Sequence, residues 1–427
     1  MTNGKLLIKG GRIIDPANKV DVVGDLLIAD GRIAQVGGKI ADASAETLAA
    51  AGCIVCPGLI DIHVHFREPG EENAENIASG SAAAVAGGFT SVACMPNTSP
   101  ALDEETAIDF VYRKAAAANL CNVYAIGAIT KGRRGEELAE MGQMVRAGAV
   151  GFSDDGQGVA QTGTMYRAMQ YVTMFDRPIL QHCEDPDMAH GGVMNAGTTA
   201  TRLGLPGIHP MAEELMIQRD LTLVRHTGAR YHVCHISTHR AVELVRQAKA
   251  AGLPVSAEVT PHHLLLTEET CSNFDTNCKV NPPLRTRSDI EACIQGLIDG
   301  TIDCLATDHA PHGIQQKELE FLDAPFGIIG LESALPLYVK ALIEPGHLEW
   351  PALIEKMTVR PARVLSLNKG TLAVGADADV TVIDPKRTWT IDAAQFASKS
   401  RNCPFHGWPV AARPVATIVA GQIKYRL

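Results

Sequence analysis

The stretch GLIDIHVHFREPG, residues 58–70, places two histidines two positions apart in an apolar segment, and an arginine follows two positions later. Successive side chains of a β-strand point to opposite faces, so His63 and His65 would share one face of a strand. Neutral imidazoles are ligands that Zn²⁺ prefers, and the guanidinium of Arg67 matches the geometry of a carboxylate. The spacing therefore indicates a metal site with an anion-binding group beside it.

Further potential metal ligands stand at the ends of other apolar runs. His182, His235 and Asp308 lie there, and the run AVGFSDD ends in Asp154 and Asp155. Each alone has a simpler explanation as a core histidine, a helix cap or a turn residue. Together, four imidazoles and two carboxylates suit zinc and exceed what one tetrahedral zinc uses. We therefore expect two zinc ions, with a carboxylate of the run AVGFSDD as the candidate bridge because no lysine stands near it.

Other histidines and the cysteines carry no such signal. The eleven cysteines are an odd number spread along the chain, which indicates reduced thiols rather than a disulfide framework. The pair Cys53 and Cys56 has CxxC spacing, but without a second such pair we expect both to pack within a strand. We also expect these histidines to be structural: His190, His209, His226, His232, His239, His347 and His406.

The proposed ligands need a scaffold that brings separate strand ends together. Eight apolar runs, each followed by an Ala-, Glu- and Leu-rich segment with helical spacing, occupy the middle of the chain: LIDIHVH, TSVACMPN, NVYAIGAIT, AVGFSDD, PILQHCED, YHVCHIST, PVSAEVTPHH and DCLATDHAPH. This alternation predicts an α/β fold, a closed parallel (β/α)₈ barrel of the TIM type, whose active sites lie at the carboxyl ends of the strands. The alternative, a doubly wound open sheet, needs a glycine-rich phosphate turn that the first run lacks.

The two ends of the chain show a different sequence pattern from the middle. Both contain short strand-like runs with tight turns, such as KLLIKGGRIID and PVATIVAGQIKYRL. We expect residues 1–54 and 365–427 to form one small β-sandwich domain beside a barrel of residues 55–364.

Composition limits the classes of partner. The net charge is −10, and no dense basic run offers a track for a phosphate backbone, so nucleic acid is not an expected partner. The N-terminal residues lack the apolar core of a signal peptide, and no apolar run is long enough to cross a bilayer, so we expect no membrane association and a cytoplasmic location.

The motifs in order along the chain resemble those of one enzyme family. GLIDIHVHFREPG, MPNTSP, GFSDDG, HCED, HISTHRAVELV, EVTPHHLLLTEE, KVNPPLR, ATDHAPH and PFGIIGLE are similar to dihydroorotases of the bacterial class I type, within the amidohydrolase superfamily. The HxH and ATDHAPH elements indicate a cyclic amidohydrolase in general. HFREPG, KVNPPLR and PFG narrow the resemblance to dihydroorotases.

The resemblance implies roles for individual residues. His63, His65 and Asp308 match the ligands of one zinc, His182 and His235 those of the other. Asp155 and a hydroxide match the bridge between the two zinc ions. Substrate contacts fall on the side chains of His65, Arg67, Asn97, Asn281 and His312 and on the backbone of Phe326 and Gly327.

The implied reaction is the reversible hydrolysis of (S)-dihydroorotate to N-carbamoyl-L-aspartate in pyrimidine biosynthesis. A hydroxide between the zinc ions would be the nucleophile. Asp308 would be the catalytic residue that carries the proton to the leaving ring nitrogen, and Arg67 would hold the substrate carboxylate. A homodimer and an association with aspartate transcarbamoylase are further expectations from the resemblance.

Two alternatives remain open at this point. A dihydropyrimidinase-like or allantoinase-like enzyme would share the zinc ions and differ in the cation that binds the substrate. An inactive homologue with a structural role should have lost ligands, whereas all six positions are filled here. The segment GIQQKELEFLDAPFG, residues 313–327, is expected to be a lid over the substrate.

Overall fold

A barrel of parallel β-strands forms the larger part of the computed structural model, which describes residues 4–427. Eight strands form one sheet in the order β15-β14-β13-β10-β9-β8-β7-β6. Their bounds are Leu59–Val64 (β6), Phe89–Cys94 (β7), Asn122–Ala128 (β8), Gly151–Ser153 (β9), Ile179–Gln181 (β10), Tyr231–Val233 (β13), Val255–Val259 (β14) and Cys304–Leu305 (β15). Seven of the eight predicted runs contain one of these strands, and β7 begins one residue before its run.

The first barrel strand, β6, pairs with the segment that directly follows the last one, β15. Val64 forms a parallel bridge with His309, and the backbone N–H of His65 donates to the carbonyl of His309 at 2.8 Å. The side-chain hydroxyl of Thr307 donates to Asp61 at 2.5 Å in the same region. These contacts complete the circle, and the predicted (β/α)₈ barrel is confirmed.

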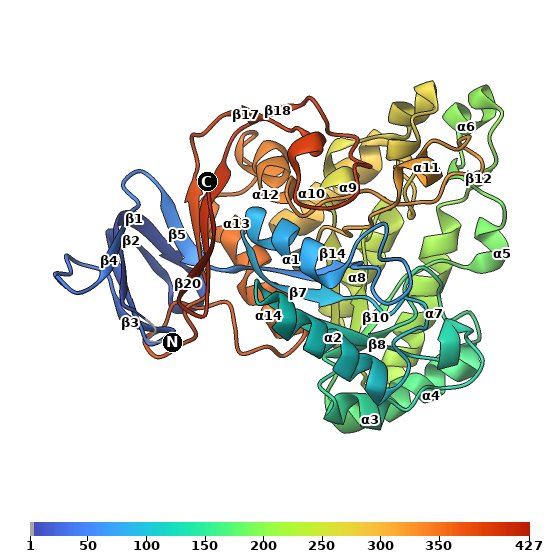
Figure 1. Cartoon of the computed structure of the whole chain (residues 1–427). Helices are drawn as coiled ribbons and strands as arrows, with labels where there is room; N and C mark the ends of the chain where they lie inside the picture. The colour runs from blue at the N-terminus through green and yellow to red at the C-terminus, as the bar shows by residue number, and fades with distance from the viewer. Residues whose placement is uncertain (1–3) are drawn as a thin grey trace.

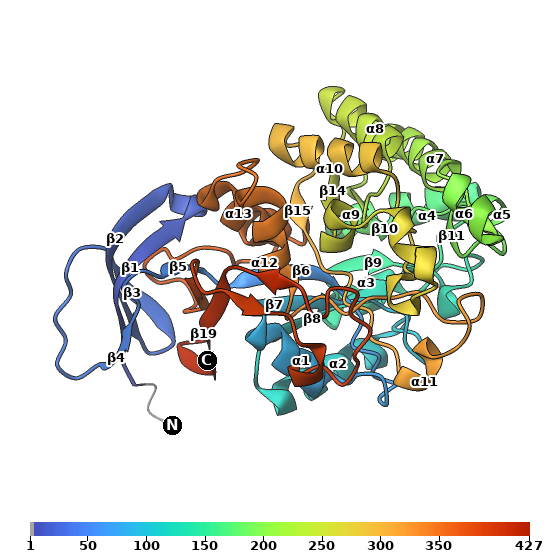
Figure 2. The ribbon, with the colours of Figure 1, turned by 90° about the horizontal axis from the view of Figure 1, so that it is seen from above.

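Helices follow the barrel strands and surround them (Figures 1 and 2). They are Ile77–Ala86 (α1), Glu105–Ala118 (α2), Met141–Arg146 (α3), Thr162–Val172 (α4), Met211–Thr227 (α7), His239–Ala250 (α8), Arg287–Asp299 (α10), Trp350–Met357 (α13) and Val359–Val364 (α14). Shorter elements extend the loops after β10, β14 and β15: Pro186–Ala189 (α5), Met194–Asn195 (β11), Thr198–Leu203 (α6), Gly207–Ile208 (β12), Pro261–Leu265 (α9), Ile314–Lys317 (α11) and Ala334–Tyr338 (α12). Among residues 4–427, no helix is both long enough and apolar enough to span a membrane.

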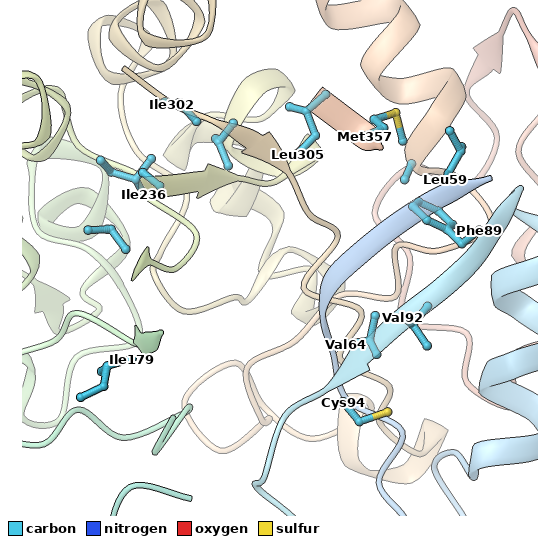
Figure 3. Close-up of a cluster of buried hydrophobic side chains, with 14 of the residues drawn as sticks. Leu59, Val64, Phe89, Val92, Cys94, Ile179, Ile236, Ile302, Leu305 and Met357 are labelled. Atoms are coloured by element: carbon cyan, nitrogen blue, oxygen red, sulfur yellow. The ribbon is translucent and has the colours of Figure 1, made fainter. Parts of the chain in front are cut away.

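Two apolar clusters hold the barrel together. The larger packs barrel strands against the surrounding helices and includes Leu59, Phe89, Ile179 and Met357 (Figure 3). The second joins buried side chains from strands around the barrel with residues that follow α13, so it fills the inside of the barrel. Its members include Ile62, Ile126, Leu180 and Cys304 in the strands and Cys234 just after β13, and Val364 and Leu365 pack against them.

Strands from both chain ends form one further sheet at the side of the barrel (Figure 1). Its members are Leu6–Asp15 (β1), Val20–Ala29 (β2), Arg32–Val36 (β3), Glu46–Ala49 (β4), Ile54–Pro57 (β5), Val380–Asp384 (β16), Arg413–Val419 (β19) and Gln422–Arg426 (β20). β5 pairs with β1 on one side and with β16 on the other, which joins the N-terminal strands to the C-terminal ones. The expected shared β domain is thus confirmed, whereas its boundaries at residues 54 and 365 stay a prediction.

Candidate metal-dependent active site

Each predicted metal ligand lies at or just beyond the carboxyl end of a barrel strand. This placement follows from the fold, because parallel strands bring their carboxyl ends to one face of the barrel. All six side chains are buried: His63 in β6, His65 after β6, Asp155 after β9, His182 after β10, His235 after β13 and Asp308 after β15.

The carboxylate of Asp155 lies among the four imidazoles. Its Oδ1 is 3.4 Å from Nε2 of His63, 3.6 Å from Nε2 of His235 and 3.8 Å from Nδ1 of His182. Its Oδ2 is 3.5 Å from Nε2 of His65. One carboxylate therefore faces four imidazoles from three different strand ends.

The remaining contacts divide the site into two groups around that carboxylate. In one, Oδ1 of Asp308 is 2.9 Å from Nε2 of His65 and 3.5 Å from Nε2 of His63. In the other, Nδ1 of His182 is 3.0 Å from Nε2 of His235. The structure thus brings all six predicted ligands together.

The hydrogen bonding of the donor atoms fits a metal centre. Nε2 of His63 and Oδ1 of Asp155 are buried and lack a hydrogen-bond partner among residues 4–427, although they face each other. Buried polar atoms are otherwise nearly always paired, because leaving them unpaired costs about 1–3 kcal/mol. A cation that accepts both lone pairs removes this cost, and the nitrogen-rich donor set suits zinc.

The neighbouring imidazoles keep both carboxylates ionised. Burial on its own raises the pKa of Asp155, but the neighbouring imidazoles of His63 and His235 hold it well below its usual range. Burial also works against the charged form of Asp308, and the neighbouring imidazoles of His63 and His65 lower its pKa in the same way. Both carboxylates are therefore acceptors at neutral pH, as metal ligands must be.

Hydrogen bonds on the far side of two imidazoles set their orientation. Nδ1 of His63 is 2.5 Å from Oε1 of Glu258, and Nδ1 of His65 is 2.7 Å from Oδ1 of Asn97. With the hydrogen on Nδ1, the Nε2 atoms of both rings keep their lone pairs for the site. Asn97, expected to contact substrate, thus also contacts a predicted ligand.

Sequence reasoning missed Glu258. It lies in β14 within the predicted run PVSAEVTPHH, and it is fully buried. A glutamate between apolar residues of a buried strand is the one signal that could have marked it, since isolated buried carboxylates are rare. Burial opposes its ionisation, but His63 and His232 hold its pKa at about 2.

The structure separates the two adjacent aspartates that the sequence left as alternatives. Asp154 turns away from the site: its Oδ1 accepts from the backbone N–H groups of Ile129 at 2.8 Å and Thr130 at 3.1 Å. Asp154 therefore anchors the chain after β8, and Asp155 is the residue that faces the imidazoles.

A cavity of about 300 Å³ opens beside the predicted ligands. Inside it, the guanidinium of Arg67 donates from Nε to the carbonyl of Pro311 at 3.1 Å. The nearest carboxylate in an ion pair with it, Glu71, is 3.9 Å away, so the charge of this buried group is poorly compensated. Every residue expected to contact substrate lines this cavity: His65, Arg67, Asn97, Asn281, His312, Phe326 and Gly327.

Some of these lining groups already have partners within the chain. Nε2 of His312 lies 2.7 Å from the carbonyl of Phe326 and 3.2 Å from Nη2 of Arg67. Burial and the Arg67 charge lower the pKa of His312 to about 3, so its ring is neutral. Gly327 uses both backbone groups, donating to Lys279 and accepting from Asn402. The buried Oδ1 of Asn281 has no hydrogen-bond partner within residues 4–427.

Family models and solved structures place this barrel in a known class. The model described as dihydro-orotase-like matches residues 52–241, and that of the amidohydrolase family matches residues 299–425. The structure is similar to that of an L-hydantoinase (dihydropyrimidinase) from Arthrobacter aurescens, with a TM-score of 0.88, 28% identity, and coverage of 98% of this chain and 96% of that chain. A dihydropyrimidinase from Brevibacillus agri shares the fold with a TM-score of 0.86 at 21% identity, covering 99% of this chain and 95% of that chain. The fold and donor set define a metal-dependent amidohydrolase.

Similarity over the whole chain narrows the class to one family. A dihydroorotase from Pelotomaculum thermopropionicum is 52% identical over 98% of both chains, and one from Syntrophotalea carbinolica is 52% identical over 99% of both. The chain belongs to the dihydroorotase family, whose members are hydrolases acting on a cyclic amide.

Proposed function

We propose that this chain catalyses the reversible hydrolysis of (S)-dihydroorotate to N-carbamoyl-L-aspartate, the dihydroorotase step of pyrimidine biosynthesis. The observation that carries the proposal is a poorly compensated guanidinium, Arg67, in the same cavity as the six donors. Dihydroorotate has both features that such a site requires, a cyclic amide to be opened and a carboxylate to be held.

The cofactor in this proposal is a pair of zinc ions. His63, His65 and Asp308 would hold one ion, His182 and His235 the other, and Asp155 both. The position of the Asp155 carboxylate among four imidazoles supports this division. When bound, two divalent zinc ions make water nucleophilic at neutral pH and polarise the amide carbonyl.

Asp308 is the proposed carrier of the proton. Its carboxylate lines the cavity and is ionised, so it can accept the proton that the attacking water loses. As the ring C–N bond breaks, the same group delivers that proton to the leaving nitrogen. In the ring-closing direction it takes the proton from that nitrogen and returns it to the departing water.

Arg67 is the proposed group that holds the substrate carboxylate. The other proposed substrate contacts are the side chains of His65, Asn97, Asn281 and His312 and the backbone of Phe326 and Gly327. Arg67 is held by Pro311, which aims its remaining N–H groups without neutralising its charge. A guanidinium binds a carboxylate with two parallel hydrogen bonds, and burial strengthens them. Neutral cyclic imides lack the carboxylate, so this interaction favours dihydroorotate over them.

Turnover with a metal count tests the function. Purified enzyme should contain two zinc ions per chain and open dihydroorotate much faster than dihydrouracil or allantoin. Removing zinc with a chelator should abolish turnover, and adding zinc back should restore it. Preference for dihydrouracil or allantoin would contradict the proposed substrate, and a zinc-replete chain without any turnover would favour the inactive homologue.

Assembly and location are further parts of the proposal. We expect a homodimer, an association with aspartate transcarbamoylase and a cytoplasmic location. Sedimentation of the purified chain, alone and with the transcarbamoylase of the same organism, tests the first two, and cell fractionation tests the third.

A further inference from the structure

Glu258 collects hydrogen bonds from three residues at the base of the site. Its Oε1 lies 2.5 Å from Nδ1 of His63 and 3.4 Å from the backbone N–H of His235, and its Oε2 lies 3.1 Å from Nε2 of His232. Glu258, His63 and His232 are fully buried. Both oxygens of a buried carboxylate are thus engaged, and two of the three partners are predicted metal ligands.

The chemistry of a carboxylate fixes the direction of these hydrogen bonds. An ionised carboxylate only accepts, so both His63 and His232 must donate to it. His232 then has a lone pair on Nδ1, which lies 2.7 Å from the hydroxyl of Ser256. The hydrogens in the chain of hydrogen bonds from Ser256 through His232 and Glu258 to His63 can therefore be placed in only one consistent way.

The same arrangement prepares His63 for metal binding. Its hydrogen is on Nδ1, and its Nε2 lone pair faces Oδ1 of Asp155 at 3.4 Å and Oδ1 of Asp308 at 3.5 Å. Glu258 also accepts from the backbone N–H of His235, which belongs to the other group of ligands. His235 has a left-handed φ of 33°, a strained conformation that contacts with neighbouring residues must stabilise.

We propose that Glu258 is a positioning residue that fixes His63 in the tautomer required of a ligand and ties the strand end carrying His235 to it, so that one carboxylate orients ligands of both metal ions. This inference rests on the proposed metal centre. Stability alone does not explain the group, because an apolar side chain of similar volume is often no less stable than a buried ionic cluster.

Replacing Glu258 with glutamine separates the hydrogen-bond role from packing. Glu258→Gln keeps the size, but its NH₂ group must face one imidazole, which then has to give up its donated hydrogen. If that ring is His63, the hydrogen moves to Nε2 and blocks the metal. We expect zinc affinity, measured by competition with a chromophoric chelator, to fall about 10- to 100-fold, with a matching loss of kcat at low zinc and little change in KM.

A control from the neighbouring strand tests for a packing effect. Cys304 is the parallel-strand partner of Glu258, is fully buried and contacts no predicted ligand by hydrogen bond. Cys304→Ala should keep the zinc affinity of the unaltered enzyme. Equal losses in Cys304→Ala and Glu258→Gln would overturn the proposal.

A second variant keeps the test decisive if Glu258→Gln folds poorly. Glu258→Asp retains the charge but withdraws the carboxylate by one methylene from Nδ1 of His63, so it should also weaken zinc binding. Unaltered zinc affinity in both folded variants would overturn the positioning role. Zinc affinity is measured without substrate, so a wrong proposed substrate would leave this outcome unaffected.

Discussion

Three residues of the site adopt a backbone conformation that L-residues seldom occupy. Arg67, His235 and Asp308 have φ values of 60°, 33° and 49°. Each such residue costs about 1–3 kcal/mol, and proteins keep this strain mainly where it aims a functional side chain. Here it turns the chain sharply after β6, β13 and β15, so that side chains beyond a strand end point back over the barrel mouth.

At Asp308 the proposed ligand and proton-transfer roles can be separated. Asp308→Asn keeps an oxygen that can bind metal but cannot accept a proton. We expect kcat to fall about 10²- to 10⁴-fold in both directions of the reaction, the usual contribution of a general acid–base group, while zinc per chain stays near that of the unaltered enzyme. Steady-state kinetics and elemental analysis give the two readouts. A kcat close to normal would contradict the proton-transfer role.

At Arg67 the expected change is in substrate binding. Arg67→Met keeps most of the buried aliphatic length and removes the charge. Losing a hydrogen bond to a charged group costs about 1.5–3 kcal/mol, so KM for dihydroorotate should rise about 10- to 150-fold. Zinc content should not change, and the slow turnover of neutral dihydrouracil should be little affected. An unchanged KM would show that another group holds the carboxylate.

The residues that the sequence predicted and those that it missed lie in different parts of the site. A polar residue at or near the end of an apolar run is visible in the sequence, which is why five of the proposed ligands and Arg67 could be predicted from the pattern of runs. Glu258 and His232 support ligands from inside the barrel, and their role depends on contacts between β6, β13 and β14 that no local pattern records. Asp154 and Asp155 could be told apart only by resemblance, because backbone direction after a three-residue strand is not set locally.

At the scale of elements, two buried lysines hold the segment 313–327 beside the cavity. Nζ of Lys279 donates to the carbonyls of Phe321 at 2.7 Å and Leu322 at 3.0 Å, and Nζ of Lys317 donates to the carbonyl of Pro325 at 2.8 Å. Burial and the neighbouring Lys279 charge lower the pKa of Lys317 to about 7. Lys317 is thus only partly charged at neutral pH, and Lys279 is the main cation that binds the proposed lid. The cavity-lining residues Pro325, Phe326 and Gly327 belong to the same segment.

Lys279→Met tests whether this fastening matters. Without the ammonium, the buried carbonyl of Phe321 and the partly buried carbonyl of Leu322 lose their donor, which should lower the free energy of local opening by about 2 kcal/mol. Amide hydrogens of residues 313–327 should then exchange about 30-fold faster, and KM for dihydroorotate should rise. The exposed Glu320 of the same segment offers a control, since Glu320→Gln should change neither quantity. Equal exchange in Lys279→Met and the unaltered enzyme would contradict the fastening role.

At the scale of the whole molecule, the C-terminal strands complete a sheet that the N-terminal strands begin. β16 pairs with β5, which leads directly into β6, the strand that carries His63. The alternation of the eight central runs predicted the barrel, and the similar texture of the two ends predicted their association. The pairing itself was not predictable, because β5 and β16 are more than 300 residues apart and no spacing in the sequence links them.

The carboxylate of Asp379 lies where the terminal sheet meets the barrel, and it provides a test of how these two parts stabilise each other. Asp379 accepts from Nδ2 of Asn122 at the start of β8 (2.9 Å), from Nζ of Lys369 (2.7 Å) and from the backbone N–H of Ala420 between β19 and β20 (2.8 Å). It is buried, whereas Asp377, the other partner of Lys369, is 40% exposed.

Asp379→Ala should therefore destabilise the molecule far more than Asp377→Ala. Removing one partner of a buried ion pair costs about 3–5 kcal/mol, and we expect the lower end because Asp377 still holds Lys369. The exposed Lys369–Asp377 pair contributes less than about 1 kcal/mol to the free energy of unfolding, so Asp377→Ala should lower that free energy only slightly. Urea unfolding gives the free energy of unfolding of both variants. The measurements should use one zinc concentration, so that bound metal stabilises both variants equally. Equal shifts would mean that the Asn122 and Ala420 contacts of Asp379 add nothing to the stability of the molecule.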